Sequence, residues 1–146
     1  MPAWRSARIV SSAPSTSDAG IQVHLVTAGI AQAIALLADH FGIRSVHAVA
    51  LHFTPDGAYE DFNRRSFLTR AGGKELVVRD VRARSHGRAV FVGDGVSDLE
   101  TKPAVDLFIG FGGVHVRPRV KENADVYVEE SRLTALLPHI IAEEAS

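Results

Sequence analysis

An apolar run that ends abruptly in carboxylates limits the folds open to this chain. Ala89-Val90-Phe91-Val92 has no polar side chain, and Gly93-Asp94-Gly95-Val96-Ser97-Asp98 follows directly. A strand that is apolar at every residue, rather than at every second one, is typical of a parallel sheet covered on both faces. Ligands of such sheets bind at the carboxyl ends of the strands. The run therefore predicts a buried parallel strand with a functional edge at Asp94.

The segments before this run alternate between strand and helix patterns. Residues 21–26 read as a strand that stops at Thr27-Ala28-Gly29. In the helix expected next, apolar residues recur at steps of three and four and predict one buried face: Ile30, Ile34, Leu37 and Phe41. Gly42 stands where a left-handed helix cap is expected. Residues 45–53, a turn at Pro55-Asp56-Gly57 and residues 58–62 predict a β-hairpin.

The alternation continues to the end of the chain. Lys74 opens a predicted helix, and residues 107–109 and 126–128 read as two further apolar strands. Ser131 is the expected N-cap of a last helix with one apolar face: Leu133, Leu136, Leu137, Ile140 and Ile141. Together these segments predict an α/β fold, with a Rossmann-like, mostly parallel sheet, helices on both faces and a small β-hairpin insertion.

Composition narrows the class of protein. The 146 residues are 46% hydrophobic and 23% charged, which suits one globular domain. We expect residues 1–19, rich in Ser, Ala and Pro, to be irregular with at best a short strand at Arg8-Ile9-Val10, and residues 20–146 to form the domain. The absence of cysteine excludes disulfides and thiolate metal sites.

The net charge and the hydropathy pattern indicate which partners and which cellular compartment to expect. A formal net charge of -1 provides no basic field for nucleic acid or for an anionic membrane surface. The start of the sequence lacks the layout of a secretory signal. The uncharged run at 20–38 contains polar residues and changes its period at Thr27-Ala28-Gly29, which suits a strand joined to a helix better than a membrane span. We therefore expect a cytoplasmic protein.

Three features fall at predicted strand ends or helix starts and suggest a ligand. They are Thr27-Ala28-Gly29, Lys74 and the segment Asp94 to Asp98. A hydroxyl beside backbone N–H groups at a helix start binds phosphate oxygens, and a lysine adds a full positive charge. Carboxylates at Asp94 and Asp98 are hard oxygen ligands of the kind that Mg²⁺ takes together with water and phosphate. Phosphate with Mg²⁺ is the implied ligand pair.

Other polar or glycine-rich features have less specific readings. Gly93-x-Gly95 and Gly110-x-Gly112-Gly113 look like fragments of a dinucleotide fingerprint, but neither has its third glycine at the proper step. Arg117 and Arg119 either reach an anion or form a solvated basic turn. The histidines show no local pair with metal-ligand spacing, which favours ordinary surface or core sites: His24, His40, His47, His52, His86, His115 and His139.

Read together, these segments resemble the phosphoserine phosphatases of the haloacid dehalogenase superfamily. The matching pieces are Val26-Thr27-Ala28-Gly29, Gly72-Gly73-Lys74, the segment from Val92 to Glu100, the run from Asp106 to Gly113, and Val120-Lys121-Glu122-Asn123-Ala124-Asp125. The resemblance covers about Gly20 to Val128, and several motifs in register are far more specific than any one of them.

The resemblance implies a role for each matching residue. Thr27, Ala28 and Gly29 would bind the phosphoryl group, Lys74 would neutralise it, and Ser97 would lie nearby. Asp94 would coordinate Mg²⁺, with Asp98 in support. The implied reaction is hydrolysis of O-phosphoserine to serine and phosphate, within serine biosynthesis, through attack by an aspartate and an aspartyl-phosphate.

The chain departs from this family in one important respect. The family's first motif is an apolar strand followed by Asp-x-Asp-x-Thr, and no Asp-x-Asp occurs in these 146 residues. The helical cap that follows that motif is missing as well. The first-motif strand is central in the family's sheet, so its absence leaves three possibilities: the N-terminal segment replaces that strand, a partner chain replaces it, or two neighbouring strands lack a partner and the fold is only marginally stable. We expect activity to be impaired, because removing the nucleophile from a catalytic unit costs orders of magnitude in rate.

Several interpretations stay open. The chain is read as the C-terminal part of a phosphoserine phosphatase-like hydrolase, with a small phosphomonoester as substrate. It can also be a non-catalytic phosphate- and Mg²⁺-binding fragment, or one that a partner chain or a second copy completes. A phosphatase of the same superfamily for another small phosphomonoester, and a dinucleotide-binding module, are the remaining alternatives.

Overall fold

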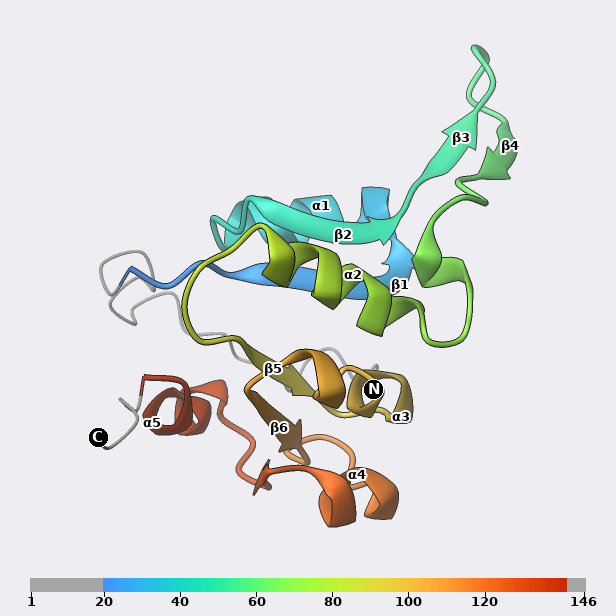
Figure 1. Cartoon of the computed structure of the whole chain (residues 1–146). Helices are drawn as coiled ribbons and strands as arrows, with labels where there is room; N and C mark the ends of the chain where they lie inside the picture. The colour runs from blue at the N-terminus through green and yellow to red at the C-terminus, as the bar shows by residue number, and fades with distance from the viewer. Residues whose placement is uncertain (1–19, 142–146) are drawn as a thin grey trace. The chain divides into compact units, whose positions relative to one another are not determined.

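The computed structural model describes residues 20–141, which fall into two compact units, residues 20–81 and residues 82–141. Figure 1 shows the helices and strands of both units, coloured by residue number. The expected irregular segment 1–19, with the predicted strand Arg8-Ile9-Val10, lies outside the described residues.

The first unit is built on a parallel strand pair. Strand β1 (His24–Ile30) pairs with β2 (Ser45–Val49), and helix α1 (Ala31–His40) joins them and packs against both. The prediction of a strand at 21–26 was wrong in its bounds, because β1 begins later and runs through Thr27, Ala28 and Gly29. Its register against β2 shifts between Val26 and Ile30. Three small or polar residues thus remain extended but leave the regular ladder.

The apolar face expected on α1 is mostly not buried. Ala38 is 2% exposed, but Ile30 and Leu37 are 45% and 47% exposed. These side chains stay exposed because the sheet under α1 has only two strands, and a sheet that narrow covers only a narrow stripe of a helix. Ala31, Ala35 and Ala38 of α1 line a hollow together with Ile43 and Val46 of the following segment. Gly42 has φ of +66°, which confirms the predicted left-handed cap.

The hairpin is confirmed, although residues 45–53 are not one strand. After β2 the chain starts a separate strand β3 (Leu51–Phe53), which pairs antiparallel with β4 (Tyr59–Phe62). Figure 1 shows this hairpin projecting beyond β2. The side chain of Gln32 anchors its base, because its amide donates to the Leu51 carbonyl at 2.8 Å and accepts from the Leu51 N–H at 3.1 Å.

A 3-10 turn, η2 (Phe67–Thr69), leads from the hairpin to helix α2 (Gly73–Ala83). The helix begins one residue before Lys74, close to the predicted start. Val78 is buried, and Val77 and Val81 are half-buried.

The second unit is a parallel sheet in the order β5-β6-β7, formed by β5 (Val90–Gly93), β6 (Leu107–Phe111) and β7 (Val126–Val128). Its connections contain α3 (Val96–Leu99), η3 (Lys102–Ala104) and α4 (Pro118–Asn123). The central strand β6 carries the core, with Phe108 and Ile109 fully buried. All three predicted strands are present, but β5, which was expected to be buried on both faces, is only half-buried along its length, whereas β6 is mostly buried.

The predicted last helix is interrupted. The structure has a 3-10 helix η4 (Leu133–Leu136) followed by a short α5 (Leu137–Ile140). Pro138 explains the break, because it has no N–H for a continuous α-helical ladder but fits the first turn of a new helix. Ser131 is not the N-cap, since Arg132 precedes the first turn and no side chain caps it. Leu136 still packs on Ile109 and Val128.

Both units pair their long strands in parallel, so the predicted α/β class is confirmed. Within residues 20–141, β1 has β2 as its sole neighbour and β5 has β6 as its sole neighbour. No helix in this part of the chain is long and apolar enough to cross a membrane.

Candidate functional site

The loop after β5 is held in shape by Asp98. Its Oδ2 atom accepts hydrogen bonds from the N–H of Asp94 at 3.2 Å and from the N–H of Gly95 at 3.0 Å. The Asp98 residue is 8% exposed, and Thr101 donates its hydroxyl to the Asp98 carbonyl at 2.6 Å. A buried carboxylate that accepts two backbone N–H groups fixes the path of the chain. Asp98 therefore turns inward and supports the loop.

Asp94 is presented outward by the same loop. Its side chain is 47% exposed, at the carboxyl end of β5, and its Oδ2 atom accepts a hydrogen bond from Arg117 Nη1 at 2.9 Å. Arg117 stands immediately before α4 and belongs to the same unit. Sequence reasoning left Arg117 open between an anion contact and a solvated turn and missed this partner, because no local spacing links Arg117 to Asp94.

The Asp94 carboxylate can supply one of the several ligands that Mg²⁺ requires. An exposed carboxylate is the hard oxygen donor that Mg²⁺ takes, and this cation commonly keeps several waters and a substrate phosphate in its remaining sites. Residues 20–141 contain no group of three or more His, Cys, Asp or Glu side chains that could hold a metal ion. A cation at Asp94 therefore needs further ligands. Ser97 is exposed on the first turn of α3, next to this loop.

The other predicted phosphate-binding residues belong to the unit of residues 20–81. Thr27 and Gly29 lie where the register of β1 shifts, and the Gly29 N–H donates to Thr27 Oγ1 at 3.0 Å. Ala28 between them is exposed. Lys74 lies in the first turn of α2. The structure thus places Thr27, Ala28, Gly29 and Lys74 in one unit and Asp94, Ser97 and Asp98 in the other; that all of them form one site stays a prediction.

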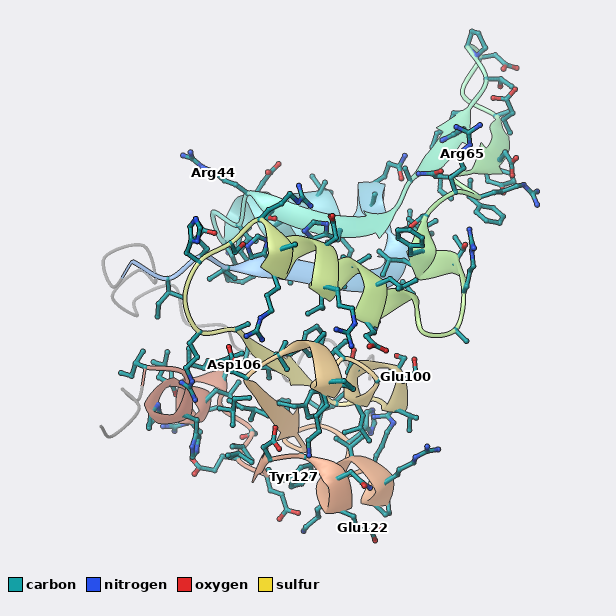
Figure 2. All side chains as sticks on the ribbon, viewed as in Figure 1. Arg44, Arg65, Glu100, Asp106, Glu122 and Tyr127 are labelled. Atoms are coloured by element: carbon teal, nitrogen blue, oxygen red, sulfur yellow. The ribbon has the colours of Figure 1, made fainter. Side chains whose placement is uncertain are left out.

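The glycines within and just after β6 have a packing role. A Cβ atom on Gly112 would lie 2.2 Å from the hydroxyl oxygen of Tyr127, and one on Gly110 would lie 2.6 Å from the Tyr127 ring. Tyr127 is labelled in Figure 2. Side chains cannot approach that closely, so both residues must be glycine for Tyr127 of β7 to lie against the β6 segment. This packing explains the glycine run without a dinucleotide.

Two histidines that are distant in sequence lie together. His24 Nδ1 is 2.6 Å and His47 Nε2 is 3.3 Å from the hydroxyl oxygen of Ser45, and the two rings stack with centroids 5.9 Å apart. The parallel register sets His24 beside Ser45. Sequence reasoning tested local spacing alone and missed this pair. The bridge links β1 to β2, in keeping with the structural role expected of the histidines.

Comparison with known proteins places these motifs in a family. No protein-family model matches the chain. Phosphoserine phosphatase of Bos taurus is 34% identical over 116 residues, which cover 77% of this chain and 52% of that protein. Phosphoserine phosphatase of Drosophila melanogaster is 36% identical over 115 residues, covering 76% of this chain and 43% of that protein.

The solved structures agree on the fold. A phosphoserine phosphohydrolase-like protein from Francisella tularensis aligns with a TM-score of 0.71 at 19% identity, over 86% of this chain and 58% of that one. Identity at this level shows the fold alone. The chain spans about half the length of the sequence relatives it matches. From its sequence and its fold, the chain belongs to the phosphoserine phosphatase-like proteins of the haloacid dehalogenase superfamily.

Proposed function

We propose that this chain is part of a hydrolase that converts O-phosphoserine and water into serine and phosphate. The observation that carries the proposal is the loop after β5, where Asp98 fixes the backbone and Asp94 is presented outward at the end of a parallel strand. The names of the sequence relatives support phosphoserine as the substrate class. The proposal includes serine biosynthesis as the process and the cytoplasm as the compartment.

The phosphate-binding tasks fall to the unit of residues 20–81. We assign the hydroxyl of Thr27 and the backbone at Ala28 and Gly29 to the phosphoryl oxygens, and Lys74 to the neutralisation of their charge. The Gly29 N–H donates to Thr27 Oγ1 in the structure. That bond must open before the N–H can donate to a phosphate.

The cation-binding tasks fall to the loop after β5. In this proposal Asp94 supplies one ligand for Mg²⁺, Asp98 keeps that ligand in place, and Ser97 lies beside the phosphate. When bound, Mg²⁺ neutralises charge on the phosphoryl oxygens. The 146 residues offer no Asp-x-Asp nucleophile, so the attacking carboxylate must come from outside this sequence.

A complementation assay tests the proposal. Release of phosphate from O-phosphoserine with Mg²⁺ is measured for the chain alone and with a polypeptide that supplies an apolar strand and Asp-x-Asp-x-Thr. We expect little release from the chain alone and clear release from the mixture. Lys74→Met and Asp94→Asn should each lower that release by orders of magnitude. Glu100→Gln is the matched control on the exposed end of α3.

Two results would contradict the assignment. Release that survives both Lys74→Met and Asp94→Asn would show that these residues are not part of the site. A mixture that releases phosphate from other small phosphomonoesters but not from O-phosphoserine would keep the superfamily and overturn the substrate.

A second candidate function follows from the strand edges. Within residues 20–141, β1 pairs with β2 alone and β5 pairs with β6 alone, so each has one side without a neighbouring strand. Unpaired strand edges are templates for another strand. They favour a phosphate-binding chain that a partner chain or a second copy completes. Binding of O-phosphoserine by the pure chain, without hydrolysis and without gain from the added polypeptide, would support this candidate.

A further inference from the structure

We propose that Arg117 is the resident counter-ion of Asp94 and competes with a divalent cation for its carboxylate. The contact is specific, since Arg117 Nη1 lies 2.9 Å from Asp94 Oδ2 and 3.4 Å from the Asp94 carbonyl oxygen. Both residues belong to the unit of residues 82–141, so the pair is internal to one compact body. The proposal rests on the assignment of Asp94 as a cation ligand in the proposed function.

The other charged side chains near this pair have partners of their own. Lys102 pairs with Asp125 at 2.9 Å and donates to the Asn123 carbonyl at 2.7 Å. Lys121 pairs with Glu129. Asp98 turns its carboxylate to backbone N–H groups. Asp94 is thus the carboxylate that the loop presents outward, and Arg117 is the cation that it meets there.

Arginine and Mg²⁺ make incompatible demands on one carboxylate oxygen. The guanidinium is always charged and has only donors, whereas a metal ion needs the lone pairs of the same oxygen. Two cations at one carboxylate also repel each other. The Arg117 side chain must therefore leave Oδ2 before a cation binds there. The free energy needed to break the ion pair reduces the net free energy of cation binding.

The pair is weak enough to be displaced. Its side chains are 44% and 47% exposed, and exposed ion pairs contribute little to stability. We therefore expect Arg117 to lower cation affinity by about two- to five-fold rather than to block the site. In this proposal Arg117 neutralises the charge of the Asp94 carboxylate when no cation is present, and a bound cation displaces it.

A Mn²⁺ titration of the full chain tests the competition. Mn²⁺ prefers the same oxygen ligands as Mg²⁺, and its free concentration is read by electron paramagnetic resonance. The variants are Arg117→Gln and Arg119→Gln. Arg119 is exposed in the first turn of α4, two residues after Arg117, and its backbone carbonyl accepts a hydrogen bond from the Asn123 side chain, so this control removes the same charge without touching Asp94. Unfolding curves confirm that each variant is folded.

We expect Arg117→Gln to bind Mn²⁺ about two- to five-fold more tightly than the unchanged chain, with a smaller change for Arg119→Gln. In an Asp94→Asn background, Arg117→Gln should give no more gain than Arg119→Gln. Equal affinities for the two arginine variants, a gain that persists without Asp94, or no detectable binding by Arg117→Gln would each overturn the proposal. The titration needs neither substrate nor nucleophile, so its failure is distinguishable from a failure of the hydrolase assay.

Discussion

Asp94, in the loop after β5, and Asp98, in the following helix α3, are the same residue type, yet their carboxylates have opposite roles. The Asp98 carboxylate is buried and accepts from two backbone N–H groups, whereas the Asp94 carboxylate is half-exposed and meets Arg117. Hydrogen bonds to a buried charged acceptor contribute more to stability than an exposed ion pair does. Their effects on folding should therefore differ.

Asp98→Ala should destabilise the chain more than Asp94→Ala. The first change leaves the N–H groups of Asp94 and Gly95 without their acceptor, and we expect the free energy of unfolding to fall by about 2–3 kcal/mol. The second change removes an exposed ion pair and should cost less than about 1 kcal/mol. Urea denaturation of the full chain gives both values, and equal losses would contradict the supporting role of Asp98.

At the scale of elements, the start of α2 depends on a close backbone contact. A Cβ atom on Gly73 would lie 1.7 Å from the carbonyl oxygen of Phe67, in the 3-10 turn η2. The backbone of η2 cannot move aside as a flexible side chain could. Gly73 thus sets where α2, and with it Lys74, begins.

Gly73→Ala should therefore be costly even though alanine is a better helix former. We expect a loss of about 3 kcal/mol in the free energy of unfolding, because the methyl group forces the two segments apart. Leu76→Ala on the same helix is the control, since Leu76 is 48% exposed and should change stability little. Thermal and urea unfolding measure both, and a neutral Gly73→Ala would show that the contact gives way.

Asp106 joins the starts of two strands in the other unit. Its Oδ2 atom accepts from the Ala89 N–H at 2.8 Å and its Oδ1 atom from Arg82 at 2.6 Å. The hydrogen bond from Ala89, followed by that from Arg82, lowers the pKa of Asp106. At Asp125 burial opposes ionisation, but bonds from the Phe108 N–H and Lys102 outweigh it, so the pKa of Asp125 is also lowered.

A carboxyl group with a lowered pKa in the folded state stabilises the fold at pH values above its unfolded pKa of about 3.9. This contribution is lost as the pH falls through the folded pKa. We expect the free energy of unfolding to decrease as the pH falls below about 5, and less steeply for Asp106→Asn, which should also be less stable at neutral pH. Urea titrations at several pH values measure this, and identical pH profiles would contradict it.

At the scale of the whole molecule, the two parallel sheets differ in how completely their strands are paired. Ile109 and Gly110 of β6 lie between β5 and β7. Among residues 20–141, β1 and β5 each have one neighbour. In such an edge strand every second N–H group points away from the ladder.

Amide hydrogen exchange should report this difference. We expect the N–H groups of Ile109 and Gly110 to exchange slowly, and alternate N–H groups of β5 to exchange at least about ten-fold faster, because local opening is not required to expose them. Uniform slow exchange along β5 would show that another strand covers its outer side. Adding the polypeptide of the complementation assay should slow the fast amides if it pairs there.

The motifs were predictable because each depends on a few neighbouring residues. Ala89-Val90-Phe91-Val92 and the following aspartates predicted β5 and its loop, and Gly42 predicted the end of α1. The extent of burial on α1 was not predictable, since its exposed Leu37 depends on how wide the supporting sheet is. Pro138 carried a local signal for the break in the last helix, which the apolar pattern obscured.

By itself the sequence determined the α/β class, the order of the strands along the chain, the phosphatase-like motifs and the lack of an Asp-x-Asp. Apolar periodicity, turn residues and motif spacing are local properties that can be read along one chain. Only the tertiary structure decided that Arg117 meets Asp94, that His24 and His47 share Ser45, and that Tyr127 requires Gly112. Such contacts join residues far apart in sequence, and strand register and packing alone bring them together.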